Sequence, residues 1–450
     1  MVDAASGHPA DRENDDMAFL PGTTPAIAGG LLLLGTTAAF AQNANRPELV
    51  AGIPVNYDEE LVGDYTLPDP LVLQNGEPVR DAETWYNRRR PELVRLFEEH
   101  QYGRTPAAPE DMWFEVTEQA GVAFDGQAVR RQVTVHFTED PEGPKMDLLV
   151  YLPANAEGPV PMLLNISFSP NAAVVADTMV HLGTMWSPQT RERVPARRAS
   201  QTRTPIERIL SEGFAFGTVY YGDIDPDFMG GATLGIRALF LEPGQTEPAP
   251  DEWGAISAWA WGLSRALDYF QTDPDIDAAR VAITGASRLG KTVLWAGVRD
   301  PRFAMVIASV SGAGGAALER RNYGETIGHL VAEGRYPYQF ARNWANYAEN
   351  PDESPVDSHM LVALMAPRPL LLQTGNTDYW SDPKGEFLAA VAAEPVWELL
   401  GVKGLGTDIM PEPDQPILNT LGYLMHDGGH GMVPGDWDVY LDFMRMHLLD

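Results

Sequence analysis

The chain has no cysteine and very little lysine. Its 450 residues contain no cysteine at all, which excludes disulfide bridges, thiol nucleophiles and thiolate metal sites. Only four lysines occur, at positions 145, 291, 384 and 403. Two of them, Lys291 and Lys384, lie in the segments that carry the candidate chemistry described below.

Positive charge is scarce as a whole. The sequence has 32 Lys and Arg against 63 Asp and Glu, a formal net charge of −31 at pH 7. Such a balance argues against nucleic acid or an anionic membrane surface as a partner. Because acid-rich, lysine-poor surfaces stay soluble in concentrated salt, a saline habitat is a hypothesis that follows from the composition.

Long apolar runs are also missing, except near the N-terminus. The run Ala26–Gly35 is followed by an A-x-A motif that ends at Ala41, which is the pattern of a secretory leader. The run is short for a membrane span, and the residues before it are acidic, although initiation at Met17 would remove those acids. We expect residues 1–41 to be cleaved after Ala41 and the protein to be secreted or periplasmic, with an uncleaved membrane anchor as the alternative.

The rest of the chain predicts an arm and one large domain. Residues 42–80 are rich in proline and polar residues and predict an extended arm, and residues 81–450 predict a single catalytic domain with an insertion near 169–205. Strands are predicted at 113–118, 128–137, 146–152, 162–168, 214–221, 281–284, 303–309, 369–374 and 421–425. Helices are predicted at 81–100, 206–212, 253–270, 385–393 and 437–447. This alternation predicts an α/β fold with a doubly wound, mostly parallel sheet flanked by helices.

A serine lies at one of the predicted strand-to-helix corners. The strand Val281–Thr284 stops at Gly285, and Ser287 follows just before a helix-compatible stretch, as in a nucleophile elbow. The small residues that a strained turn needs are present, but Leu289 stands where G-x-S-x-G has glycine, and Gly290 comes one residue later. An ordinary Gly-Ser turn is the alternative on this segment alone.

A serine nucleophile needs a histidine base, which follows a later strand in this class of fold. The histidines after Ser287 are His329, His359, His426, His430 and His447. His447 lies on the predicted helix 437–447 and His329 in a further helix-compatible segment, so both are better explained by packing or surface roles, and His359 is better explained as a structural histidine. His426 ends the last predicted strand, whereas His430 lies on the loop that follows it, so we choose His430. The glycines between these two argue against a helical metal-binding pair.

The acid that orients this histidine is predicted to be Asp378. It follows the strand 369–374 by a few residues, where a loop carboxylate can face the histidine. Asp382, directly before Pro383, is better explained as the N-cap of the next helix. In so acidic a protein, a simple surface role for Asp378 is the alternative.

From about Trp85 onward, and most densely from Phe214 to Trp437, the chain resembles the bacterial glucuronoyl esterases of carbohydrate esterase family 15. The elbow matches the family motif G-x-S-R-x-G-K over Gly285–Lys291, which accounts for the displaced glycine. The other matching stretches are Tyr220–Asp227, Trp253–Arg265, Ser311–Ala317, Arg321–Thr326, Ala366–Pro369, Trp380–Phe387 and Gly428–His430. The combination is specific, although no single stretch is.

The resemblance implies an α/β-hydrolase fold, a three-layer sandwich, and a role for each matching residue. Ser287 would be the nucleophile, His430 the general base, and Arg288 would stabilise the oxyanion, where a fixed positive charge is effective. The residues that would hold the glucuronate unit are Lys291, Glu325 and Trp380. Neither a metal nor an organic cofactor is implied.

One departure from the family pattern concerns the acid. Many members carry a glutamate immediately before the Ser-Gly-x-Gly-Gly stretch, and this chain has Val310 there. The role would then pass to the alternative acid of some bacterial members, which matches Asp378.

The expected activity is hydrolysis of the ester between (4-O-methyl)glucuronic acid of glucuronoxylan and lignin or other alcohols, by a monomeric secreted enzyme. An acetylxylan or other carboxylic-ester hydrolase on the same fold is the first alternative. A non-catalytic carbohydrate-binding relative is the second. A peptidase is least favoured, because no separate propeller-like lid domain is visible in the sequence.

Overall fold

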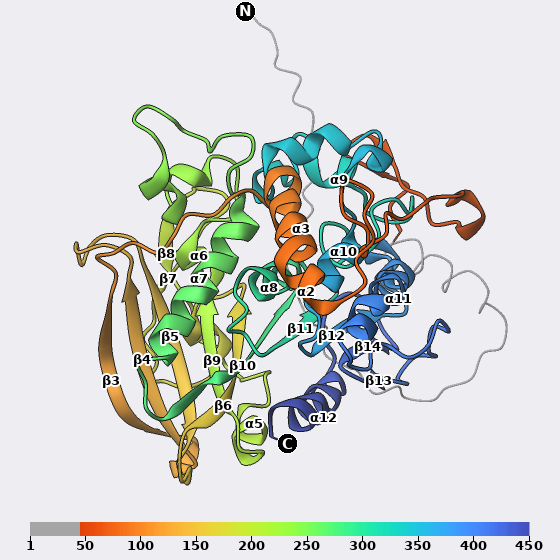
Figure 1. Ribbon diagram of the computed structural model, residues 1–450. Helices are drawn as coiled ribbons and strands as arrows, with labels where there is room; N and C mark the ends of the chain where they lie inside the picture. Colours follow the sequence, from red (N-terminus) through yellow and green to blue (C-terminus); the bar gives the residue numbers. More distant parts are fainter. Residues whose placement is uncertain (1–45, 450) are drawn as a thin grey trace, which may run out of the picture. The chain divides into compact units, whose positions relative to one another are not determined.

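The centre of the fold is a ten-stranded sheet with the strand order β13-β14-β12-β11-β10-β6-β9-β5-β4-β3 (Figure 1). The computed structural model describes residues 46–449. The strands of the sheet are β3 (Trp113–Ala123), β4 (Ala128–His136), β5 (Lys145–Pro153), β6 (Val160–Ser167), β9 (Ala215–Tyr220), β10 (Ile276–Ala286), β11 (Met305–Ser309), β12 (Leu370–Gly375), β13 (Ile417–Leu418) and β14 (Leu421–His426). The predicted leader, residues 1–41, lies outside the described residues.

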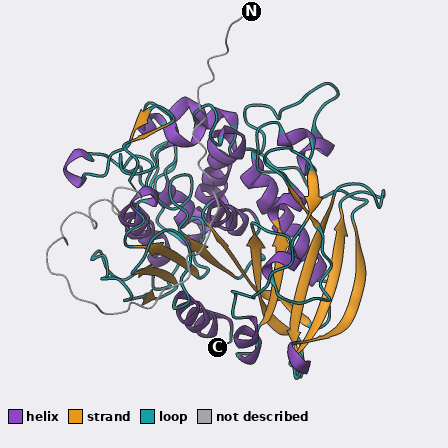
Figure 2. Cartoon of the chain, turned by 180° about the vertical axis from the view of Figure 1, so that it is seen from behind, coloured by secondary structure: helices purple, strands orange, loops and turns teal. Residues whose placement is uncertain are grey.

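The sheet is parallel in its middle and antiparallel at its start. Strands β9, β6, β10, β11, β12 and β14 pair in parallel, whereas β3, β4 and β5 form an antiparallel meander that joins β9. Figure 2 shows the long strands of this meander from behind. Because the parallel strands all run the same way, their carboxyl ends lie along one edge of the sheet, where the loops can meet.

Helices cover both faces of the sheet, so the fold has three layers. Along β6, Met162, Leu164 and Ile166 enter one hydrophobic core while Leu163 enters the other, as the two-residue period of a strand requires. The first core is closed by α3 (Arg90–Phe97), α7 (Ala255–Phe270), α8 (Arg288–Arg299), α10 (Ser358–Ala363) and α11 (Pro383–Leu399). The second is closed by α5 (Ile206–Ser211) and α12 (Asp436–Leu448). The α/β-hydrolase architecture predicted from the sequence is therefore confirmed.

Some element boundaries differ from the predictions. The single helix expected at 81–100 is divided into α2 (Ala82–Thr84), α3 and two π-helical segments, Trp85–Arg89 and Glu98–Tyr102. The helix expected to end at 393 continues to Leu399, although Pro395 lies inside it. Proline removes one helix hydrogen bond, and here the buried side chains Val396 and Trp397 hold the last turn in place.

The N-terminal arm and the insertion have little regular structure. The described part of the arm has the two-residue strands β1 (Leu49–Val50) and β2 (Ile53–Pro54) and a single 3-10 turn, Glu59–Leu61. Its Asn56 donates a 2.6 Å hydrogen bond to the carbonyl of Asn322. The insertion holds α4 (Asn171–Val174) and the hairpin of β7 (Thr184–Trp186) and β8 (Arg193–Pro195). Between residues 46 and 449, no helix combines the length and the apolarity that crossing a lipid bilayer would require.

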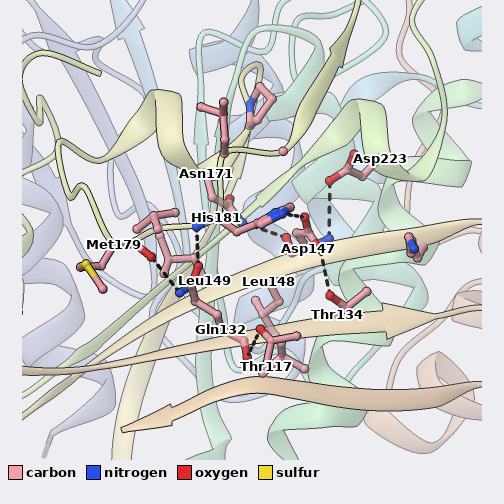
Figure 3. Close-up of a pocket in the computed structure, with 16 residues that line it drawn as sticks. Thr117, Gln132, Thr134, Asp147, Leu148, Leu149, Asn171, Met179, His181 and Asp223 are labelled. Carbon is pink, nitrogen blue, oxygen red and sulfur yellow. Dashed lines mark hydrogen bonds and ion pairs between the residues drawn. The ribbon is translucent and has the colours of Figure 1, made fainter. Parts of the chain in front are cut away.

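A cavity of about 470 Å³ lies between the insertion and strands β4 and β5 (Figure 3). Asn171 and His181 come from the insertion, and Asp147 from β5, while Asp223 follows β9. None of the site residues predicted from the sequence lines it. The predicted residues lie instead around the carboxyl edge of the parallel strands.

Candidate active site

Ser287 forms the sharp corner between β10 and α8. Its backbone has φ 58° and ψ −127°, a conformation that costs a non-glycine residue energy and that clusters at functional sites. The Ser287 amide donates to the carbonyl of Ser309 at 2.9 Å, and the Lys291 amide donates to the carbonyl of Ser287 at 3.1 Å. These bonds tie the corner to β11 on one side and to the first turn of α8 on the other.

The glycines around the corner are explained by close backbone contacts. A Cβ on Gly290 would lie 2.6 Å from the carbonyl oxygen of Ser309, and a Cβ on Gly285 would lie 2.6 Å from that of Leu289. Both distances are below ordinary van der Waals contact. Position 290, where α8 begins against β11, therefore requires glycine. This contact explains why the second glycine of the motif stands at position 290 in this chain and not at position 289.

His430 and Asp378 face each other across two neighbouring loops. His430 Nδ1 lies 2.8 Å from Asp378 Oδ2, and Ser381 Oγ lies 3.2 Å from the same nitrogen. The Asp378 side chain is 5 % exposed, whereas that of His430 is 38 % exposed. A buried carboxylate thus holds one ring nitrogen of a histidine whose ring stays open to solvent.

His426, the other histidine of this loop, is bound in a different way. Its Nδ1 lies 3.0 Å from Asp436 Oδ2 and its Nε2 donates to the carbonyl of Gly429 at 3.0 Å. Burial disfavours the charged ring, but the hydrogen bond to Asp436 outweighs it and raises the pKa of His426. Both ring nitrogens are engaged in the core, so His426 serves the structure of the loop that carries His430.

The remaining candidate histidines also have structural partners or buried positions. His359 is fully buried and its Nε2 donates to the carbonyl of Pro68 at 2.7 Å. His329, in α9 (Ile327–Val331), accepts from the Thr326 amide at 3.1 Å and so caps that helix. Burial lowers the pKa of both rings.

Arg288 pairs with an aspartate that the sequence did not single out. Its Nη1 donates to Asp227 Oδ2, and its guanidinium carbon lies 5.7 Å from the ring centre of Phe168 and 5.0 Å from that of Tyr336. Burial works against the charge, but Asp227 outweighs it and raises the pKa of Arg288 well above its usual value. The residue next to Ser287 is therefore a fixed cation.

Two of the residues expected at the sugar lie close to each other: Lys291 is buried in α8, and Glu325 is partly buried. Lys291 Nζ donates to the carbonyl of Ser311 at 2.7 Å, and the Glu325 side chain, 9 % exposed, accepts from Arg335 at 3.1 Å. Burial lowers the pKa of Lys291, and the charge of Glu325 is the largest influence that raises it. The Glu325 carboxylate therefore lies close enough to Lys291 to stabilise its charged form.

Trp380 adjoins Glu325 and is partly exposed. Its carbonyl accepts from the Glu325 amide at 2.8 Å. Its ring packs edge-on against His329 at 5.3 Å, and the Arg335 guanidinium lies 5.8 Å from it. Lys291, Glu325 and Trp380 thus come together from α8 and from the segments around 325 and 380.

Two further acids complete the surroundings. Asp382 caps α11 by accepting from the Gly385 amide at 3.0 Å, as its place before Pro383 predicted. Glu386 is fully buried, accepts from the Gly312 amide at 2.6 Å, and its pKa is raised to about 8, chiefly by burial. No sequence pattern marked Glu386, because a glutamate in the first turn of a helix normally lies at the surface.

The arrangement is chemically suited to acyl transfer. A serine at a strained corner, a histidine held by a carboxylate and an arginine beside the serine are the groups that ester hydrolysis by a covalent intermediate requires. Within residues 46–449, no group of three or more His, Cys, Asp or Glu side chains is placed to hold a metal ion.

Comparison with known proteins gives consistent matches. A family model described as fungal glucuronyl esterase matches residues 248–401. A carbohydrate esterase from an unknown prokaryotic organism is 42 % identical over 402 residues, covering 87 % of this chain and 92 % of that protein.

Solved structures agree with these matches. The glucuronoyl esterase of Solibacter usitatus has a TM-score of 0.83 and 45 % identity, covering 86 % of this chain and 100 % of that one. A structure described as a promiscuous CE15 esterase from the marine bacterial metagenome has a TM-score of 0.80 and 42 % identity, with 87 % and 100 % coverage.

Proposed function

Because this chain belongs to carbohydrate esterase family 15, the glucuronoyl esterases, we propose that it hydrolyses the ester between (4-O-methyl)glucuronic acid of glucuronoxylan and a lignin or other alcohol. The chain is a carboxylic ester hydrolase that cleaves esters of glucuronic acid. To that activity the proposal adds glucuronoxylan as the polymer and lignin as a source of the alcohol.

The observation that supports the site is the order of the strands. The elbow follows β10, Asp378 follows β12 and His430 follows β14, and in the sheet β10, β11, β12 and β14 are consecutive parallel neighbours. Loops at the carboxyl ends of adjacent parallel strands share one edge of the sheet. This shared edge supports the proposal that the serine, acid and histidine act together.

The proposed reaction has two acyl-transfer steps. Ser287 Oγ attacks the uronoyl carbonyl while His430 accepts the serine proton, and His430 then gives that proton to the departing alcohol. Water, deprotonated by His430, releases glucuronic acid and restores Ser287. Asp378 holds the histidine by its Nδ1, and Arg288 faces the negative charge that develops on the carbonyl oxygen.

The sugar acid is the part of the ester that the proposed pocket holds. Lys291 and Glu325 offer a cation and a carboxylate to the ring hydroxyls, and Trp380 offers an aromatic face. The acidic surface does not oppose this substrate, because the reacting carboxyl group is esterified and neutral.

The test is hydrolysis of benzyl glucuronate by the wild type, Ser287→Ala and Asp378→Asn. Ser287→Ala should lower kcat by at least about a thousandfold while the protein stays folded. Ser211→Ala is the matched control, because its exposed hydroxyl only donates to the carbonyl of Arg208 within α5. A Ser287→Ala enzyme with near wild-type turnover would place the chemistry on another residue.

A general acetyl esterase is the second candidate, because a relative of 42 % identity is described as promiscuous. An acetyl pocket has no use for the two charges of Lys291 and Glu325. Lys291→Met should therefore lower kcat/KM for methyl glucuronate far more than for 4-nitrophenyl acetate. Equal losses on both substrates would favour the acetyl esterase.

The proposal includes export and a monomeric state. Residues 1–41 would be removed as a leader, residues 42–80 would form the arm, and 81–450 the single catalytic domain. N-terminal sequencing of the exported protein should begin at Gln42, and light scattering should give the mass of one chain.

A further inference from the structure

Three aspartates alternate in the segment after β9, and each pairs with an arginine from a different part of the chain. Asp223, which lines the cavity of Figure 3, accepts from Arg193 of β8 at 2.8 Å. Asp225 Oδ2 accepts from Arg237 Nε at 2.9 Å, and Asp227 accepts from Arg288. The segment, which includes α6 (Tyr221–Ile224), is thus held to the insertion, to the 3-10 helix Ile236–Phe240 and to the elbow.

Asp227 is the only one of the three whose arginine adjoins the proposed nucleophile, and donors surround its carboxylate. Oδ1 accepts from the Tyr338 hydroxyl at 2.8 Å and from Gln339 Nε2 at 2.8 Å. Oδ2 accepts from the Tyr221 hydroxyl at 3.2 Å and from Arg288. Its side chain is 6 % exposed. These donors fix the orientation of the Asp227 carboxylate, and the carboxylate in turn fixes the direction in which the Arg288 guanidinium points.

The support behind Asp227 is itself rigid. Asp225 and Arg237 are buried, and Arg237 Nη1 also donates to the carbonyl of Tyr338 at 3.4 Å. The indole of Trp259 in α7 donates to the carbonyl of Asp225 at 2.8 Å. Arg237 thus holds Tyr338, whose hydroxyl donates to Asp227. Trp259 holds Asp225, which lies two residues before Asp227.

We propose that Asp227 is the positioning residue for Arg288, fixing its guanidinium for the developing oxyanion. This inference rests on the proposed function. An arginine side chain has several rotatable bonds, and holding it in advance lets its charge act without reorganisation during the reaction. The rings of Phe168 and Tyr336 border the guanidinium, while Asp227 fixes its direction and offsets the cost of keeping the charge half-buried.

The first experiment is Asp227→Asn on benzyl glucuronate. Asparagine keeps the shape and the oxygen that accepts from Tyr338 and Gln339, but it removes the charge that faces Arg288. We expect kcat to fall roughly 10- to 100-fold, as for loss of an oriented oxyanion donor, with KM within about threefold. Asp223→Asn is the matched control from the same segment, and it should leave kcat unchanged because its arginine belongs to β8.

A double-mutant cycle separates positioning from a general structural role. If Asp227 acts through Arg288, Asp227→Asn should add less than about a threefold loss once Arg288→Ala is present. Full additivity of the two losses would overturn the inference.

A rescue experiment gives a readout that a structural role would not move. Millimolar guanidinium chloride, far below denaturing levels, should restore part of the kcat of Arg288→Ala, because the added cation can bind Asp227. It should not restore the double variant, and equal rescue of both would overturn the inference.

If Asp227→Asn does not fold, Tyr338→Phe removes one donor to the same carboxylate and should lower kcat by a smaller factor, whereas an unchanged kcat would count against the inference.

The two proposals fail in different ways. If Arg288→Ala keeps wild-type kcat, the role of Arg288 in the proposed mechanism is wrong. If Arg288→Ala is impaired but Asp227→Asn is not, only the positioning role of Asp227 is wrong.

Discussion

Asp378 and His430 join the loops after two adjacent parallel strands, through a 2.8 Å contact between a buried carboxylate oxygen and a ring nitrogen. The same molecule contains a second such pair, Asp436 and His426, at 3.0 Å and buried on both sides. The chemistry of the two pairs is alike, but only His430 is open to solvent. A variant of Asp436 is therefore a suitable control for a variant of Asp378, the proposed acid.

Asp378→Asn should remove most of the activity. The amide cannot stabilise the protonated ring of His430, and it favours the wrong tautomer, so kcat should fall by about a thousandfold or more with little change in KM. The measurement is steady-state hydrolysis of benzyl glucuronate. Asp436→Asn should instead lower the melting temperature and leave kcat within a few-fold. Kinetics of Asp378→Asn within a few-fold of wild type would move the acid elsewhere.

A glutamate at position 310 should partly replace Asp378. Val310 directly follows β11, between the loops of the elbow and of Asp378, and it has φ 41°. A β-branched residue is disfavoured at positive φ, so an unbranched side chain relieves strain there. In the Asp378→Asn background, Val310→Glu should raise kcat roughly tenfold by supplying a new carboxylate to the histidine.

Val310→Gln is the control for that gain, because it has the same length and no charge. Equal activity of the glutamate and glutamine variants would show that position 310 cannot serve His430. The comparison also tests why the chain can lack the family glutamate.

The sequence predicted the buried strands well, because parallel strands carry continuous apolar runs that no surface segment shares. The predicted corner at Ser287 and the predicted contact between His430 and Asp378 are both present, because strand ends and small residues mark such loops. The end of α11 was missed for a physical reason. Pro395 normally breaks a helix, and only the tertiary packing of Trp397 and its neighbours overrides that rule.

Asp227 and Glu386 could not be assigned a role from the sequence. In a chain with 63 acidic residues, an aspartate in a loop or a glutamate in a first helical turn is usually solvated. Their partners, Arg288 for one and Gly312 for the other, are distant in sequence. The three-dimensional fold alone brings these groups together, so no local pattern signals them.

Gly290→Ala should destabilise the elbow. The new Cβ would lie 2.6 Å from the carbonyl oxygen of Ser309, so α8 must shift away from β11, at a cost of about 1–3 kcal/mol. Thermal unfolding measures the loss, and kcat should fall with it because Ser287 begins the same helix. Gly158→Ala is the control, since nothing lies within 4 Å of its Cβ position. Equal melting temperatures for both variants would show that the close contact is not needed.

Glu386→Gln should stabilise the protein at alkaline pH and not at acidic pH. Burial raises the pKa of Glu386 from 4.5 to about 8. Between these values the folded protein keeps a proton that the unfolded chain has lost, so the free energy of unfolding falls as the pH rises through this window. Glutamine does not titrate, and its oxygen can still accept from the Gly312 amide. The melting temperature of the variant minus that of the wild type should therefore grow from about pH 5 to pH 8, in favour of the variant. All other buried acids titrate in both the variant and the wild type, so their effects cancel in this difference. A difference in melting temperature that stays constant from about pH 5 to pH 8 would mean that Glu386 is ionised in the folded protein over that whole range.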